Sequence, residues 1–419
     1  MKRTLIGTTA LAGILLGGAY LAGQDDTALI NEANAAQDAD VGGTVVLLKL
    51  AVPAGDEVGD VVRKDAKLSS GFDVIDRRSL PAALVRESGF NKKQWAETGA
   101  QAVIKNAEIS GQIKFQLYDL AKGAKPVLSK GYPAGDKRKA AHRFMNEVIK
   151  YYTGTLGVFG SRIAFVRTRR DPITSKNVFT VQMNGEATSA ITSNRSLNIL
   201  PAMGPGGEVV FTSYAKRNPD LWMSSGGTPK RVSKFPGLNL GGAVSPDGST
   251  IALALSKDGN AELYTVDRSG NIKNRLTKNP AIDGQPSWSG GGQIAFVSDR
   301  AGGPQVYRMS AAGGGESRVT KAGNYNQSPD WSQGKGRGQW IVYSGRDNSN
   351  RYDIFKIDVK SGKVVRMTQS PGRNLDPSWS PDGRWITYTQ GGSLYVANED
   401  GNNNVEIAKG VSTPDWGPK

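Results

Sequence analysis

The chain has 419 residues, too many for one hydrophobic core of ordinary size, so its length predicts about two or three domains. It contains no cysteine, which excludes disulfides, thiol chemistry and a lipid-bearing cysteine. The formal net charge of +15 raises nucleic acid or another polyanion as a partner, but the longest basic run is only Arg167-Thr-Arg-Arg170. Basic residues spread over turns favour a mildly basic exported surface, and polyanion binding would need them to gather on one face.

The first 42 residues are expected to lie outside the folded domains. Residues 1–23 start with Met1-Lys2-Arg3 and continue as an uncharged, mostly apolar run, which is typical of an export signal and weak for a membrane span. We expect cleavage after Gly23 or as late as Ala35, leaving a mature protein without a membrane span. Residues 24–42 are polar, acidic and without periodicity, so we expect a flexible arm, either functional or inert.

Residues 43–156 are predicted to form an α/β domain. Apolar and β-branched runs predict strands at 44–52, 72–75, 102–109, 112–120 and 127–132. Helices are predicted at 56–68, 91–98 and 136–153. In the last helix apolar residues recur at helical spacing and form one stripe that can lie on a sheet, and Gly154 ends it.

From residue 157 to 419 a unit of four short strands recurs, with Gly, Pro, Asn, Asp or Ser between the strands. The second strand of each unit is apolar, and its six copies begin at Ile163, Val209, Ile251, Ile294, Ile341 and Ile386. The intervals are 46, 42, 43, 47 and 45 residues. A period of this length with four strands per unit predicts a β-propeller of six blades.

The ends of this repeat predict how the ring closes. No first strand precedes Ile163, whereas Thr413-Pro-Asp-Trp416 repeats the end of a first strand after the last unit. We therefore expect an α/β N-terminal domain followed by an all-β six-bladed β-propeller closed by a C-terminal strand. The tryptophans that end the first strands recur at a fixed repeat position, so we expect them to pack between blades.

The residue inventory offers little for catalysis. The one histidine, His142, is expected on the surface of the helix at 136–153, and no Gly-x-Ser-x-Gly elbow is present. The Asp-Gly pairs that could suggest calcium are explained by turn geometry. We expect no catalytic residue, cofactor or metal. The alternative is a propeller enzyme acting on polysaccharide or peptide, which a cluster of carboxylates with a cation in the channel would favour.

The segments that lead from the outer strand of one blade to the inner strand of the next cross the mouth of the central channel. Here they are polar and amide-rich, although Asn and Asp also simply favour turns. As a ring they predict a concave polar surface suited to a protein loop or peptide. We expect partner contacts at Leu238, Asn239, Asp283, Gly284, Gln285, Asn326, Asn374 and Asp376.

Four strings resemble the TolB family of the Tol–Pal system: residues 142–166, 111–119, 298–307 and 374–383. The likeness runs from about residue 43 to the C-terminus. It implies a periplasmic, monomeric, non-catalytic scaffold for outer-membrane integrity and for envelope constriction in cell division, with no nucleic-acid partner. It also implies that the propeller binds the outer-membrane lipoprotein Pal and that the N-terminal region binds a TolA-like inner-membrane protein. Leu238 and Gly284 match loops implicated in the Pal contact of that family.

Overall fold

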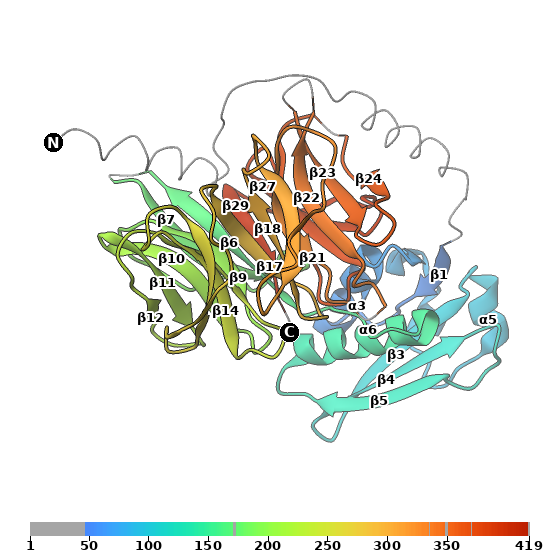
Figure 1. Ribbon diagram of the computed structural model, residues 1–419. Coiled ribbons are helices and arrows are strands. Elements are labelled where there is room, and N and C mark those ends of the chain that lie inside the picture. Colours follow the sequence, from blue (N-terminus) through green and yellow to red (C-terminus); the bar gives the residue numbers. More distant parts are fainter. Residues whose placement is uncertain (1–46, 171–172, 335, 348–350, 370, 418–419) are drawn as a thin grey trace. The chain divides into compact units, whose positions relative to one another are not determined.

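The computed structural model describes residues 47–170, 173–334, 336–347, 351–369 and 371–417 (Figure 1). These residues divide into two compact units, one ending at Gly160 and the other beginning at Ser161. No helix in the described part of the chain is both long and apolar enough to cross a membrane. The expected export signal and arm, at residues 1–42, lie outside the described residues.

The amino-terminal domain is built on one mixed sheet with strand order β2-β1-β3-β4-β5. Strand β1 is parallel to β2 and β3, whereas β3, β4 and β5 are antiparallel. Its elements are β1 (Leu48–Ala51), α3 (Glu57–Leu68), β2 (Phe72–Val74), η1 (Arg77–Ser79), α4 (Ala82–Val85), α5 (Lys92–Glu97), β3 (Ala102–Ile109), β4 (Gln112–Asp119), β5 (Leu128–Pro133) and α6 (Lys137–Thr153).

Side-chain caps explain where the three longer helices of this domain begin. The carboxylates of Asp56 and Asp136 accept hydrogen bonds from the third backbone amide of α3 and α6, at 2.8 and 2.9 Å. Asn91 caps α5 in the same way. Gly154 ends α6 with φ at 75°, a conformation that glycine adopts without strain. The helices predicted at these positions therefore begin at the capping residues, and α6 ends at the glycine, that the sequence indicated.

The second unit is a six-bladed β-propeller, as predicted, in which each blade is a four-stranded antiparallel sheet. The blades, from inner to outer strand, are β29-β6-β7-β8 (Val411–Trp416, Arg162–Arg169, Ser175–Gln182, Ser189–Ala190), β9-β10-β11-β12 (Asn198–Met203, Val209–Lys216, Asn218–Ser224, Lys230–Ser233), β13-β14-β15-β16 (Asn239–Val244, Thr250–Leu255, Glu262–Asp267, Ile272–Arg275), β17-β18-β19-β20 (Asp283–Trp288, Gln293–Ser298, Gln305–Ser310, Ser317–Arg318), β21-β22-β23-β24 (Asn326–Trp331, Trp340–Arg346, Tyr352–Asp358, Val364–Arg366) and β25-β26-β27-β28 (Asn374–Trp379, Trp385–Gln390, Ser393–Asn398, Val405–Lys409).

The predicted closure of the ring is confirmed. Strand β29 pairs antiparallel with β6, with Trp416 opposite Ile163. The Trp416 side chain is 6% exposed, and its indole nitrogen donates a hydrogen bond to the hydroxyl of Ser161 at 2.8 Å. The last strand therefore completes the first blade, and the inner strands form a closed ring.

The propeller core lies between neighbouring blades. One cluster joins Leu263 of the third blade to Trp288 and Phe296 of the fourth, and the same arrangement recurs around the ring. Because each blade covers an apolar face of the next, no blade can bury its own faces alone. Trp288, Trp331 and Trp379, which end inner strands, pack in these clusters, as expected.

The prediction for His142 is wrong. Its side chain is 2% exposed, and its Nδ1 lies 2.7 Å from the Oδ2 of Asp65, a buried carboxylate of α3. Helix α6 buries two sides: Phe144 stacks on Phe115 of the sheet, while His142 faces α3. Burial raises the pKa of Asp65, and the hydrogen bond from His142 partly opposes that shift. The apolar stripe seen in the sequence predicted only the side of α6 that lies on the sheet, and it did not predict the side that packs against α3.

Candidate functional site

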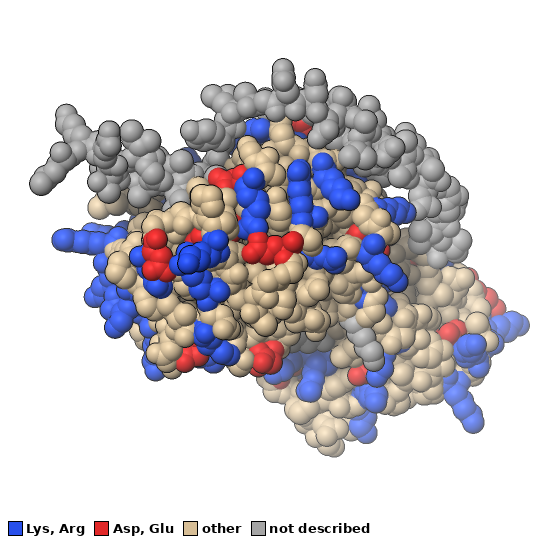
Figure 2. All heavy atoms as spheres, in the orientation of Figure 1, with Lys and Arg blue, Asp and Glu red and all other residues tan. Residues whose placement is uncertain are grey.

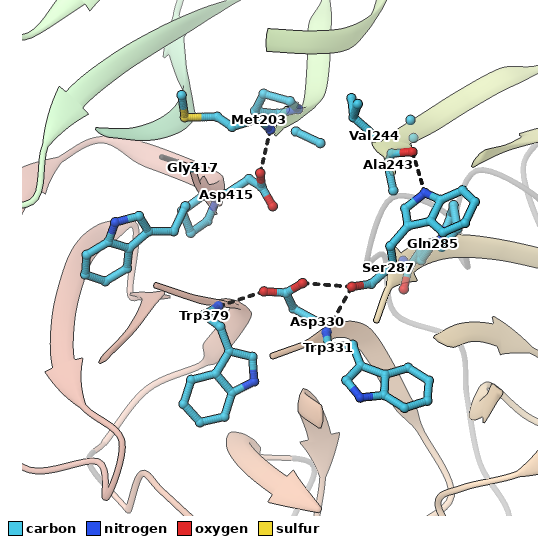
Figure 3. Close-up of a pocket in the computed structure, with 18 of the residues that line it drawn as sticks. Met203, Ala243, Val244, Gln285, Ser287, Asp330, Trp331, Trp379, Asp415 and Gly417 are labelled. Carbon is cyan, nitrogen blue, oxygen red and sulfur yellow. Dashed lines mark hydrogen bonds between the residues drawn. The ribbon is translucent and has the colours of Figure 1, made fainter. Parts of the chain in front are cut away.

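The six inner strands surround a central channel of about 380 Å³ (Figure 3). Its wall is made by one equivalent four-residue segment from each blade, so the repeat in the sequence becomes a ring in space. The segments are Leu200–Met203, 241–244, 285–288, 328–331, 376–379 and 413–416.

Each of these segments begins with a residue at positive φ, where the inner strand shifts register against its neighbour. The angles are 52° at Leu200, 58° at Gly241, 52° at Gln285, 50° at Ser328, 53° at Asp376 and 46° at Thr413. The register shifts fall at the same place in all six blades. A β-bulge redirects side chains, and this repeated bulge lies along the channel wall. Only one of the six positions is a glycine, so five side chains are held in a backbone conformation that they rarely adopt.

The third residue of each segment decides how neighbouring blades are joined. Where it is Ser or Asp, its side-chain oxygen accepts a hydrogen bond from the backbone amide of the fourth residue in the next blade. The pairs are Ser287 with Trp331 at 2.9 Å, Asp330 with Trp379 at 2.7 Å, Ser378 with Trp416 at 3.0 Å and Asp415 with Met203 at 2.6 Å. In the second and third blades this residue is Ala202 and Ala243, which have no side-chain acceptor. The polar ring therefore spans four of the six junctions, and Figure 3 shows the contacts made by Ser287, Asp330 and Asp415.

The two carboxylates of this ring are electrostatically unusual. Asp330 and Asp415 keep some access to the channel, but protein atoms enclose them on the other sides. Burial raises the pKa of both, and for Asp415, where repulsion from Asp330 adds to the effect, the pKa rises to about 8. Burial likewise raises the pKa of Asp376, against the hydrogen bond donated by Ser328 at 2.8 Å. The channel wall therefore favours protonated carboxyls.

The channel has two chemically different sides. The second and third blades contribute Leu200, Ala202, Met203, Ala243 and Val244. The other four blades contribute hydroxyl, amide and carboxyl groups, together with a proline and a tryptophan from each. The described residues contain no group of three or more His, Asp or Glu side chains placed to hold a metal ion. The one histidine, His142, belongs to the amino-terminal domain. This wall can accept and donate hydrogen bonds on one side and pack against apolar groups on the other.

We call the side on which each outer strand leads to the next inner strand the mouth face. The structure buries four of the predicted contact residues there: Asn239, Asp283, Asn326 and Asn374. Asn239 accepts hydrogen bonds from Ser233 at 2.6 Å and from the amide of Phe235 at 3.0 Å. The polar groups of these four residues hold the crossing segments against the blades. The expectation that their side chains are presented at the mouth is therefore corrected. Whether these loops contact a partner stays a prediction.

The other four predicted residues lie at or near the channel. Gln285 and Asp376 line it, and Gln285 accepts a hydrogen bond from the amide of Ser328 at 2.7 Å. Leu238 is half-buried and packs with Leu200 and Ile282 around a small apolar cluster. Gly284 is buried within β17 and pairs with Val297.

Sequence reasoning missed the residues that join the blades at the channel wall: Ser287, Asp330, Ser378 and Asp415. A signal for them exists. The string Pro-Ser-Trp or Pro-Asp-Trp occurs at 286–288, 329–331, 377–379 and 414–416, always with a short acceptor between Pro and Trp. Its recurrence at one repeat position indicates a contact made in every blade that carries it.

Two family models match the chain. The model described as TolB beta propeller domain matches residues 149–419, and the TolB amino-terminal domain matches residues 45–125. The crystal structure of TolB from Acinetobacter baumannii is similar over 89% of this chain and 97% of its own, with a TM-score of 0.78 and 25% sequence identity. That likeness covers both domains.

Curated relatives are more similar in sequence but over a shorter region. The Tol-Pal system protein TolB of Anaeromyxobacter dehalogenans strain 2CP-C is 36% identical over 248 residues, which is 56% of this chain and 56% of the relative. The protein of the same name from Desulfosudis oleivorans is 31% identical over 240 residues, 54% of each chain. The chain thus spans about half the length of the curated relatives it matches.

Proposed function

The chain belongs to the TolB family, and on that premise we propose that it is a non-catalytic periplasmic scaffold of the Tol–Pal system. The propeller binds a Pal-like outer-membrane lipoprotein, and the amino-terminal region binds a TolA-like inner-membrane protein. The protein acts as a monomer in outer-membrane integrity and in envelope constriction during cell division. The observation that carries this proposal is the match of both domains, in the same order, to the two TolB models.

The mouth face is the surface that we assign to the lipoprotein. Leu238 and its neighbours Leu200 and Ile282 form a half-buried apolar cluster beside the channel, of the kind that anchors protein interfaces. Gln285 and Asp376 add polar groups on the channel wall. In this proposal the buried residues Asn239, Asp283, Asn326 and Asn374 act indirectly, because they fix the shape of the loops that the partner touches.

The experiment is a binding titration of purified lipoprotein against a matched pair of variants. Leu238→Glu places an unpaired charge in the apolar cluster, which would be desolvated on binding and should cost about 2–5 kcal/mol of binding free energy. Ile272→Glu makes the same change at an exposed aliphatic residue of β16, where the strand leaves the turn on the opposite face. It should bind like the unmodified protein.

A second substitution tests the neighbouring blade. Gly284→Arg should also abolish the complex, and circular dichroism must show that the variant is folded, because Gly284 is buried. Equal affinity of both mouth-face variants and the unmodified protein would reject the mouth face as the binding surface. Loss of affinity in Ile272→Glu alone would move the interface to the opposite side.

A further inference from the structure

Basic side chains on the mouth face of the first two blades form no ion pairs with the described acidic residues. The residues are Arg169, Arg170, Lys176, Arg195, Lys216 and Arg217, which we call the cationic sector. The one acidic residue in the same loops, Asp171, lies outside the described residues. Six neighbouring cations that pair with no described carboxylate repel one another, and an anionic partner would relieve that repulsion.

The corresponding loops of the next three blades have a different composition. Lys257 pairs with Asp258 at 2.9 Å, and Arg300 pairs with Asp283 at 2.9 Å. Arg351 pairs with Asp347 at 3.4 Å. At this structural position the third, fourth and fifth blades therefore each have an ion pair, although Lys278, Lys321, Arg346 and Arg373 add positive charge there. What sets the first two blades apart is that none of their six basic loop residues pairs with a described acidic residue.

The loops that carry the cationic sector lie side by side. Lys176 of β7 lies opposite Thr168 of β6, and its backbone amide donates to the carbonyl of Ser196 at 3.0 Å. The carbonyl of the next residue, Leu197, accepts from the amide of Tyr214 at 3.0 Å, which leads to the turn with Lys216 and Arg217. Figure 2 shows Lys and Arg side chains projecting over the blades that contain β7 and β10.

Two aliphatic side chains lie exposed among these cations. Ile173 is 57% exposed and Leu197 is 37% exposed. Leu197 forms an isolated backbone bridge with Lys176, which places it beside one of the basic residues. Of the three large apolar side chains that the described propeller exposes most, these two lie in the loops that carry the cationic sector. Exposed aliphatic groups surrounded by basic residues are typical of surfaces that rest on anionic membranes.

We propose that the cationic sector binds the anionic headgroups of a phospholipid bilayer, with Ile173 and Leu197 entering the interfacial layer. Nucleic acid fits less well, because the nearby aromatic side chains, Phe179 and Tyr214, are half-buried and are not free to stack on bases. An acidic peptide usually occupies a groove, and none of the six cations lines the channel.

The test is co-sedimentation of the full chain with vesicles of phosphatidylcholine, with or without phosphatidylglycerol. Binding should require phosphatidylglycerol and should weaken as salt screens the charges. The variant Arg169→Gln/Arg195→Gln/Lys216→Gln should partition on the order of 100-fold more weakly, since each cation near an anionic bilayer contributes about fivefold. Ile173→Ser should weaken partition roughly tenfold through lost apolar burial.

The matched control is Lys230→Gln/Lys360→Gln/Lys363→Gln, which removes the same charge from exposed turns on the opposite face. It should bind vesicles like the unmodified protein. Equal binding by the two triple variants would overturn the assignment of the surface, and an unchanged Ile173→Ser would overturn the inserting role of Ile173. Capture by polyglutamate or by single-stranded DNA, with no binding to vesicles, would overturn the lipid assignment.

Discussion

The two domains bury polar side chains in different ways. The propeller repeats one contact: the side chain of Ser287, Asp330, Ser378 or Asp415 accepts from a backbone amide of the next blade. The amino-terminal domain buries a single pair, His142 and Asp65, that joins α6 to α3 and has no second copy among its described residues. A repeated contact leaves a pattern in the sequence, whereas a single contact leaves none. Loss of one copy should also be tolerated better than loss of the only copy.

The largest expected effect comes from breaking the ring itself. Deleting residues 413–419 removes most of β29, exposes an edge of β6 and takes away the buried side chain of Trp416. Loss of one buried tryptophan alone costs about 3–5 kcal/mol, a large share of the stability of a domain. We expect a protein that aggregates or melts far below the full chain in calorimetry. A truncated chain that is soluble and melts at the same temperature would refute closure as a stabilising feature.

The unrepeated pair of the amino-terminal domain comes next. His142→Ala leaves Asp65 buried without its partner, so we expect a loss of about 3 kcal/mol in urea unfolding of that domain. Lys139→Ala, at an exposed site on the same helix, should change stability by less than about 0.5 kcal/mol. If both variants unfold at the same urea concentration, the pair contributes nothing and the contrast between the domains fails.

The carboxylates of the channel give a pH-dependent test. The pKa of Asp415 is raised from its ordinary 3.8 to about 8, so its contribution to stability is greatest below the ordinary pKa and is lost as pH rises through 8. Asp415→Asn keeps an acceptor for the Met203 amide but cannot ionise. Compared with the unmodified propeller, it should be similar at a pH of about 4 and more stable by a few kcal/mol at a pH of about 9.

Thermal melts across pH give the answer, with Asp73→Asn, an exposed carboxylate of β2, as control. The control should follow the unmodified protein at every pH. A constant offset between Asp415→Asn and the unmodified protein, independent of pH, would show that Asp415 titrates normally in the channel.

The smallest effect is expected from extending the polar ring. Ala243→Ser would give the third blade the acceptor that Ser287 provides in the fourth, aimed at the backbone amide of Trp288. A new hydrogen bond of this kind is worth about 0.5–1.5 kcal/mol. A rise in the melting temperature would show that the ring contact is transferable between blades. A fall would show that the apolar side of the channel needs its small side chains.

The sequence specified much of this fold because its signals are periodic or local. The interval between copies of the second strand indicated propeller blades, and the number of copies indicated six of them. Asp56, Asn91 and Asp136 marked helix starts as side-chain acceptors. The four-residue helix α4 was not predicted, because it is too short to show a period.

The candidate site was harder to predict, because side-chain direction depends on the bulge and on packing. Asn239 and Asp283 looked like turn residues open to solvent, but the crossing segments need buried acceptors and donors, which these side chains supply. Asp330 and Asp415 point into the channel because the bulge beside Ser328 and Thr413 turns their strands. His142 is buried because α3 covers a second side of α6, a tertiary contact that helical periodicity does not encode.

Strand β29 also has a consequence for how the propeller folds. Its tryptophan bonds to a serine 255 positions away in the chain, so the first blade is complete only when nearly the whole propeller has been made. Contacts between such distant residues form late and slowly, since a long loop must close first. Until then β6 and β29 both lack a strand partner, and their unpaired edges can associate with other chains. Correct maturation therefore depends on the last strand docking before another chain occupies its place.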